Sequence, residues 1–363
     1  MTSINDSLKE KTERLILEKA EEKGFTGSYE ELISIIKVGE TLGVSEALEP
    51  TDLVGVLREK KKKEDERTAD LLGYRLDKFK QVEQDLDGLQ AGLYVIGGDT
   101  NIGKTAFLIN LFMDTIETNP HLYGLFFSLD DSTDIILNRI LAIKANLPIN
   151  GIRKPQGLDK QRLADRVGAY QALEALAGRF RIEDSTKIQD FTALDHHIRE
   201  VIEGQGKDLI IAIDGLQNID TGEGELNIRE KNIARANMIK KLVTTYSVPI
   251  LTTVELRKRA VGQSISREPS IDDIMETGKF AYNANLVWLL SLDDPDKREK
   301  ISLRIGKNKL SENKQGWYLN FNRQTAEITE TGETIGQINT VKESKVKPSK
   351  QGNRDYQGAF NNV

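Results

Sequence analysis

The sequence predicts an α/β fold with a mostly parallel central sheet, preceded by a small all-helical appendage. Its 363 residues are enough for one large domain with an appendage. After Gly73, short apolar runs alternate with helical stretches, which is typical of βαβ units. Before Asp70, apolar residues recur at helical spacing among many Glu and Lys residues. We therefore expect a helical appendage and linker over residues 1–71, the α/β domain over 72–330 and a disordered tail over 331–363.

The composition excludes several classes of protein. With 38% hydrophobic residues, the chain is too apolar to be disordered throughout. No apolar run approaches the roughly 18 residues of a membrane span, and the charged start is unlike a signal peptide, so we expect a cytoplasmic protein without a membrane segment. The absence of cysteine and the presence of only three histidines exclude disulfides and a histidine-built metal site. A net charge of −6 argues against a surface that coats nucleic acid but allows a local basic groove.

The individual elements follow from local patterns. The mixed-charge run 58–67 is expected to be a solvated linker. The last two strand candidates alternate like antiparallel strands added at the sheet edge. The chain beyond Thr331 is rich in Gly, Lys, Gln, Asn and Ser, which is typical of a loose tail. The strand candidates are 93–96, 122–127, 180–182, 209–213, 249–254, 286–290, 301–305, 317–321 and 325–328.

A glycine-rich turn joins the first apolar strand to the helix predicted over 106–113. It fits the phosphate-binding loop pattern G-x-x-x-x-G-K-[ST] in the strand-to-helix context that the pattern requires. In that pattern, backbone N–H groups surround the phosphates, Lys104 bridges the β and γ phosphates, and the Thr105 hydroxyl ligates Mg²⁺. The sequence therefore predicts a site for ATP, or another nucleoside triphosphate, with Mg²⁺. The loop consists of Gly98, Asp99, Thr100, Asn101, Ile102, Gly103, Lys104 and Thr105.

A phosphate-binding loop needs a second oxygen ligand for its metal ion, and a later strand supplies a candidate. The apolar run 209–213 ends in Asp214. An acidic residue at the end of a strand is common and carries little weight alone. Its position after the phosphate-binding loop favours a role as a metal ligand beside Thr105.

Several elements in register resemble the ATPase domain of DnaB-type replicative helicases. The resemblance covers about residues 72–328 and reaches neither the N-terminal helices nor the tail. It implies a RecA-like ATPase fold, a hexameric ring with nucleotide between neighbouring subunits, and single-stranded DNA in the central channel. The matching segments are LFFSLDD at 125–131, IDGLQ at 213–217, VPI at 248–250, DIMETG at 273–278 and IGKNK at 305–309.

The resemblance assigns roles to four further residues, three of which depart from the usual type. The acid that activates water falls on Asp130, where the family usually has glutamate. The residue that senses the γ-phosphate falls on Glu255, where glutamine is usual. The basic pair that a neighbouring subunit inserts into the site falls on Lys307 and Lys309, where the pair usually ends in arginine. These changes would affect turnover more than binding, because they leave the phosphate loop and metal ligand intact. A solvated strand end is the alternative for the two lysines.

The resemblance also places DNA contacts in the polar stretch between residues 255 and 278. Its basic side chains would form a positive ring in a hexamer and grip phosphates without sequence preference. The family's DNA-contacting turn has methionine here where arginine is usual, so the backbone contact is expected to survive better. A basic surface loop without ligand is the alternative. The candidate DNA-binding residues are Arg257, Lys258, Arg259, Arg267, Glu276 and Gly278.

The motifs leave more than one function open. The first hypothesis is a hexameric DNA helicase that acts in DNA replication in the bacterial cytoplasm, moves 5′ to 3′ on single-stranded DNA, and has a primase or a helicase loader as a candidate partner. The second is an ATPase of the same type that assembles but does not unwind, serving as a loader, scaffold or partner-controlled switch. A recombinase-like filament is a further alternative. We also expect residues 74–79 to form a linker helix that docks on the next subunit.

Overall fold

The structure is a computed structural model that describes most of the chain between residues 53 and 335. The chain divides into two compact units, residues 1–69 and 70–363. In the first unit, helix α3 (Leu53–Asp65) exposes its apolar side chains and includes much of the run expected to be a linker. No helix of the described part is long and apolar enough to cross a membrane. The described residues are Ser28, Glu31, 53–65, 70–206, 208–221, 226–257, 268–274, 278–292, Asp294, 296–312 and 315–335.

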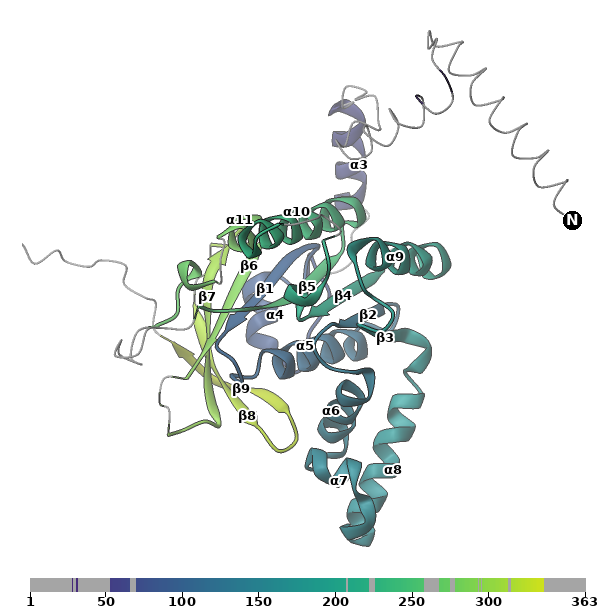
Figure 1. The fold of residues 1–363 in the computed structure, drawn as a ribbon, viewed down its shortest axis with the longest axis vertical. Coiled ribbons are helices and arrows are strands. Elements are labelled where there is room, and N and C mark those ends of the chain that lie inside the picture. Colours follow the sequence, from purple (N-terminus) through teal and green to yellow (C-terminus); the bar gives the residue numbers. More distant parts are fainter. Residues whose placement is uncertain are drawn as a thin grey trace, which may run out of the picture. The chain divides into compact units, whose positions relative to one another are not determined.

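The second unit is built on one nine-stranded sheet in the order β3-β2-β4-β5-β1-β6-β7-β8-β9 (Figure 1). Strands β1 to β6 are parallel to one another, and β7 to β9 continue the sheet from β6 as antiparallel strands. The predicted mostly parallel sheet with an antiparallel edge is confirmed. The strands are β1 (Gly92–Gly98), β2 (Tyr123–Ser128), β3 (Phe180–Asp184), β4 (Leu209–Asp214), β5 (Pro249–Glu255), β6 (Leu286–Ser291), β7 (Lys300–Asn308), β8 (Gly316–Asn322) and β9 (Glu327–Ile335).

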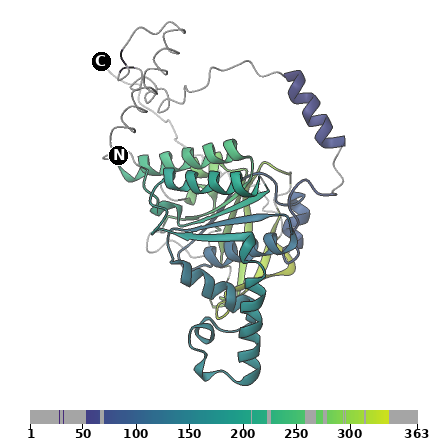
Figure 2. The ribbon, with the colours of Figure 1, turned by 90° about the vertical axis from the view of Figure 1, so that its right-hand side faces the viewer.

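Helices cover both faces of the sheet (Figures 1 and 2). Helices α4 (Lys80–Leu86) and α5 (Lys104–Thr118) lie on one face, and α9 (Phe191–Gln205), α10 (Ile228–Tyr246) and α11 (Lys279–Asn283) lie on the other. Alternate residues of β1 therefore enter different cores: Tyr94 and Ile96 pack with α5, whereas Leu93 and Val95 pack with the helices opposite. Burial on both faces explains why these strands are continuous apolar runs in the sequence.

A helical hairpin projects from the sheet between β2 and β3 (Figure 1). It consists of α6 (Thr133–Ala145), α7 (Ile149–Arg153) and α8 (Lys160–Glu174). A small core of its own, formed by residues such as Leu141, Leu147 and Ile152, holds the hairpin together. Four short 3₁₀ turns complete the described elements, at Pro155–Gly157, Ala177–Arg179, Leu216–Asn218 and Ile271–Asp273.

The end of the domain differs from the expected boundary. Strand β9 continues to Ile335, past residue 330, and pairs with β8 along most of its length. The strand also packs on α5, where buried Asn110 donates to the Ala326 carbonyl and accepts from the Ile328 N–H. The remainder of the expected tail, 336–363, lies outside the described residues.

The helix expected over residues 74–79 does not form. Tyr74 makes an antiparallel bridge with Leu89, and the next helix begins only at Lys80. Leu76 and Phe79 are fully buried in the core of their own unit, which leaves neither free to dock on another subunit. This segment is a strap that joins the start of the unit to α5.

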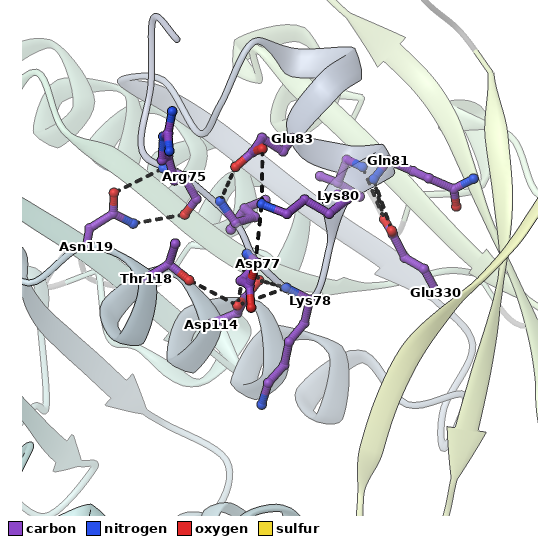
Figure 3. A network of polar contacts seen from close by, with 12 residues as sticks. Arg75, Asp77, Lys78, Lys80, Gln81, Glu83, Asp114, Thr118, Asn119 and Glu330 are labelled. Atoms are coloured by element: carbon purple, nitrogen blue, oxygen red, sulfur yellow. Dashed lines mark hydrogen bonds and ion pairs between the residues drawn. The ribbon is translucent and has the colours of Figure 1, made fainter. Parts of the chain in front are cut away.

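Two carboxylates hold the strap in place (Figure 3). The buried Asp114 carboxylate accepts the backbone N–H groups of Asp77 and Lys78 at 3.0–3.2 Å. The Glu330 carboxylate similarly accepts those of Gln81 and Val82 at 3.0–3.1 Å. Asp114 thus supplies acceptors to strap N–H groups that lie outside regular secondary structure, and Glu330 supplies them to the first turn of α4, where helix N–H groups lack a partner within the helix.

Replacing Asp114 by alanine should destabilise the second unit. The change leaves the N–H groups of the strap without their acceptor, which costs about 1–3 kcal/mol. Urea unfolding of the full chain would measure the free energy of unfolding. Asp296→Ala, at an exposed position, is the control and should change it little. Equal stability of the two variants would show that the Asp114 contacts do not hold the strap.

Candidate nucleotide-binding site

The phosphate-binding loop has the backbone shape that its glycines permit. Strand β1 ends at Gly98 and α5 begins at Lys104, so residues 98–105 form the turn between them. Gly103 has φ of +118°, and a Cβ there would lie 2.7 Å from the Phe321 ring. Only glycine combines this left-handed backbone with so close an approach. The loop therefore presents the N-terminus of a fifteen-residue helix toward the carboxyl edge of the sheet.

Lys104 lies over the loop with polar partners of its own chain. Its Nζ donates to the carbonyls of Gly98 and Asp99, both at 3.0 Å. It also lies 3.7 Å from Glu255 Oε1, in an ion pair whose lysine side chain is 12% exposed and whose glutamate is 36% exposed. Burial lowers the pKa of Lys104, and the charges of Glu255 and nearby aspartates oppose this shift.

Glu255 reaches the loop because of strand register. It pairs with Gly98 at the ends of the parallel strands β5 and β1. Besides the ion pair, its Oε1 accepts from Thr100 Oγ1 at 3.4 Å. The residue expected to sense the γ-phosphate thus contacts two residues of the phosphate loop, and it brings a negative charge to the place where a phosphate would be bound.

Asp214 closes the site from β4. Thr105 Oγ1 donates to its Oδ2 at 2.7 Å, and Thr253 Oγ1 donates to its Oδ1 at 2.7 Å. The side chain is almost fully buried, and this burial raises the pKa of Asp214, with a further contribution from the charge of Asp130. A hydroxyl and a carboxylate in contact are the hard oxygen donors that suit Mg²⁺, so these residues fit the predicted metal site.

Asp130 lies beside Asp214, just beyond the end of β2. It is exposed, and Asn218 Nδ2 donates to its Oδ1 at 3.3 Å. Gly215 brings the two strand ends together, since a Cβ there would lie 2.9 Å from Asp130 Cβ. The neighbouring Asp131 is engaged elsewhere, in a 2.6 Å ion pair with Arg139. Of the neighbouring Asp130 and Asp131, Asp130 is therefore the carboxylate that can face a ligand.

The structure does not bring Lys307 and Lys309 to the phosphate loop of the same chain. Gly98 pairs with Leu290 of β6, whereas Lys307 pairs with Val287, three residues or about 10 Å back along that strand. The Lys309 N–H donates to the carbonyl of Asn285, farther still from the loop. These lysines lie toward the opposite ends of the parallel strands, away from the phosphate loop.

The candidate DNA-binding residues are only partly described. Arg257 is exposed, and its backbone N–H donates to the Asp273 carbonyl at 2.7 Å, next to the bridge between Leu256 and Ile274. Gly278 is exposed at the start of α11. The other four, Lys258, Arg259, Arg267 and Glu276, lie outside the described residues.

Three residues of the site were not found from the sequence. Thr253 holds Asp214 and also accepts the Gly215 N–H at 3.1 Å. The polar residues within the buried strand β5 were an available sign of this role. For Asn218, the only sign in the sequence was that it lies close to Asp214 along the chain. Arg323 lies in the hairpin turn between β8 and β9 and donates to the Asn101 carbonyl at 3.1 Å, a long-range contact without a local pattern.

The buried charge of Asp214 should cost stability. A pKa raised in the folded state means that folding favours the protonated acid. The stability that protonated Asp214 contributes is present at pH values below the pKa of the unfolded state. It is lost as the pH rises through the pKa of the folded state. Asp214→Asn mimics the protonated form and should raise the melting temperature at pH 8, in metal-free buffer with chelator, by about 2–4 °C.

Asp184→Asn is the matched control with the opposite sign. Hydrogen bonds from Thr186 and Thr133 lower the pKa of Asp184, so its ionised form stabilises the fold above the unfolded pKa. This variant should melt at a lower temperature than the unaltered chain at pH 8. A loss of stability in Asp214→Asn as well would contradict the burial argument.

Comparison with known proteins agrees with this geometry. The family described as "DnaB-like helicase C terminal domain" matches residues 76–330. A probable replicative DNA helicase of Trieres chinensis is 26% identical over 216 residues, which are 58% of this chain and 46% of the relative. The replicative DNA helicase DnaB of Geobacillus stearothermophilus is 26% identical over 222 residues, 60% of this chain and 46% of the relative. The chain thus spans about half the length of these curated relatives.

Solved structures show the same fold. One that is described as an ATPase domain superposes with a TM-score of 0.69 at 15% identity, covering 78% of this chain and 99% of that one. A DnaB-like replicative helicase, described with its interactions with primase, superposes with a TM-score of 0.68 at 14% identity, covering 90% of this chain and 77% of that one. The fold is therefore the RecA-like fold of these domains, and the chain belongs to the DnaB-like helicase C-terminal domain family.

Proposed function

We propose that the protein is an ATP-dependent DNA helicase of the DnaB type, which acts in DNA replication and moves on single-stranded DNA. The observation that carries the proposal is the contact between Thr105 and Asp214 at 2.7 Å, beside Lys104 on the phosphate loop. This combination provides a phosphate cradle and a metal-binding pair within a domain of a helicase family.

The residues divide the chemistry of ATP hydrolysis among them. Thr105 and Asp214 would hold Mg²⁺, which when bound neutralises phosphate charge. Lys104 would exchange its carbonyl partners for the β and γ phosphates, and the backbone of the loop would surround them. Asp130 would orient the attacking water and accept its proton as the bond between the γ-phosphorus and the ADP oxygen breaks. Aspartate is one methylene shorter than the usual glutamate, so slow basal turnover is expected.

In this proposal the complete site needs more than one copy of the chain. Lys307 and Lys309 lie away from their own phosphate loop, so they would complete the site of a neighbouring subunit. In the proposed hexameric ring, Arg257, the other basic residues of its loop and the Gly278 backbone would grip single-stranded DNA in the channel and move it 5′ to 3′. A primase or a helicase loader is the partner that this role would require.

ATP turnover should be stimulated by single-stranded DNA, and strand separation should follow on a forked DNA duplex. Lys104→Ala removes the cation that contacts the transferred phosphate and should lower turnover roughly 100-fold or more. Phosphate release and a fluorescent unwinding assay measure the two activities.

Lys160→Ala, a change of an exposed lysine on α8, controls for loss of charge and should leave both activities unchanged. Nucleotide-dependent assembly and turnover without any strand separation would support the non-unwinding ATPase instead. No turnover with or without DNA would contradict both.

Glu255→Gln should tighten binding of the triphosphate. The substitution removes a negative charge 3.7 Å from the lysine that binds phosphate, and it retains an amide that can accept from Thr100. We expect a roughly threefold to tenfold lower Kd for a non-hydrolysable ATP analogue, and a smaller change for ADP, because the analogue carries more charge. Calorimetry would measure both. Glu200→Gln, in a surface ion pair on α9, is the control. Unchanged affinities would mean that Glu255 turns away from bound nucleotide.

A further inference from the structure

An exposed tyrosine lies among three lysines at the edge of the sheet that is far from the phosphate loop. The Tyr282 side chain, in the short helix α11, is 67% exposed. The ammonium groups of Lys279, Lys307 and Lys309 lie 5.1, 5.9 and 5.9 Å from the centre of its ring. These distances are within the range of cation–π attraction. A ring that is this exposed adds little to the hydrophobic core. Its main contacts are with the cations around it.

The backbone around Tyr282 holds the same lysines. Lys307 Nζ donates to the carbonyl of Ala281 and, at 2.8 Å, to that of Tyr282. Lys309 Nζ lies 3.5 Å from the Tyr282 carbonyl. Like charges so close repel, and burial together with Lys309 lowers the pKa of Lys307 to about 8. The ring face and two carbonyl oxygens supply the negative potential that keeps the pair together.

We infer that Tyr282 is the positioning residue for Lys307 and Lys309, and that it presents the two ammonium groups as one unit to the phosphates bound by a neighbouring copy. The inference rests on the proposed function and deepens it. Arginine carries its donors in a rigid planar fork, whereas lysine ends a flexible chain. A ring shared by two lysines restricts both side chains before the phosphate arrives, so less side-chain entropy is lost when the site forms.

Strand register supports this direction of action. Lys307 pairs with Val287 and Lys309 bonds to Asn285, both at the end of β6 that is distant from Gly98. The cluster of Tyr282 and its lysines therefore cannot reach the phosphates of its own chain without unpairing these strands. A second copy is the occupant that can bring bound nucleotide to it.

The first test compares two substitutions at Tyr282. Tyr282→Phe keeps the ring face and should retain DNA-stimulated ATP turnover close to that of the unaltered chain. Tyr282→Leu removes the ring and should lower the turnover roughly fivefold or more, as expected when the cation–π contacts that hold Lys307 and Lys309 are lost. Tyr170→Leu on α8 is the matched control, because Tyr170 also carries a cation, Arg166, over its ring at 4.8 Å and is partly exposed. That control should not change turnover.

The second test mixes variants in one assembly. Tyr282→Leu leaves its own phosphate loop intact, whereas Lys104→Ala leaves its own lysine pair intact. Where a Lys104→Ala subunit presents its lysines to the loop of a Tyr282→Leu subunit, a complete site forms. The mixture should therefore turn over ATP faster than the sum of the two variants alone.

The outcomes separate the inference from the proposed function. No turnover and no nucleotide-dependent assembly of the unaltered chain would overturn both. An active unaltered chain with an equally active Tyr282→Leu would overturn only the inference. Equal losses in the phenylalanine and leucine variants, or no gain on mixing, would do the same, because the ring would then not act on a neighbouring site.

Discussion

The parallel register of β4, β5 and β1 is the constraint on which the site depends. The three strands end at the same edge, so Asp214, Glu255 and Gly98 meet there although they are far apart in the sequence. Helices cover both faces, and a slip of one residue would exchange the two sets of core side chains. Burial of the strands thereby fixes the position of the polar groups at their ends to within the length of one residue.

The same register separates functions between copies. Strand β6 runs parallel to β1, but β7 returns antiparallel, so residues late in β7 lie beside the beginning of β6. Lys307 is therefore carried away from the phosphate loop by the topology itself. In the proposed assembly, a single copy would therefore hold two incomplete sites, one with the loop and one with the lysines. Assembly would join them, and in the proposed ring this would couple the chemistry to contact between subunits.

Much of this could be predicted from the sequence, because the apolar runs and the phosphate loop are local patterns. The position of each strand and the roles suggested for Lys104 and Asp214 follow from such patterns. The strap could not be predicted: residues 74–79 have a helical apolar spacing, but Asp114 and Asn119, distant in sequence, bond to its backbone and hold it in another form. Nor could Arg323 or Tyr282 be connected to their sites, because the contacts of Arg323 with Asn101 and of Tyr282 with Lys307 depend on tertiary packing.

The charged groups of the site have partners within the chain, and this determines which contacts nucleotide binding must change. Lys104 is paired with Glu255 and with carbonyls, so a phosphate can engage it only by displacing these partners. Glu255 ends β5, and Arg257 follows two residues later, with its backbone bonded to Asp273. Movement of the Glu255 carboxylate away from an incoming phosphate would therefore act on the strand end that carries Arg257. The backbone connects the two proposed sites through the end of β5, and a glutamate at the nucleotide end adds charge repulsion that would act on this connection.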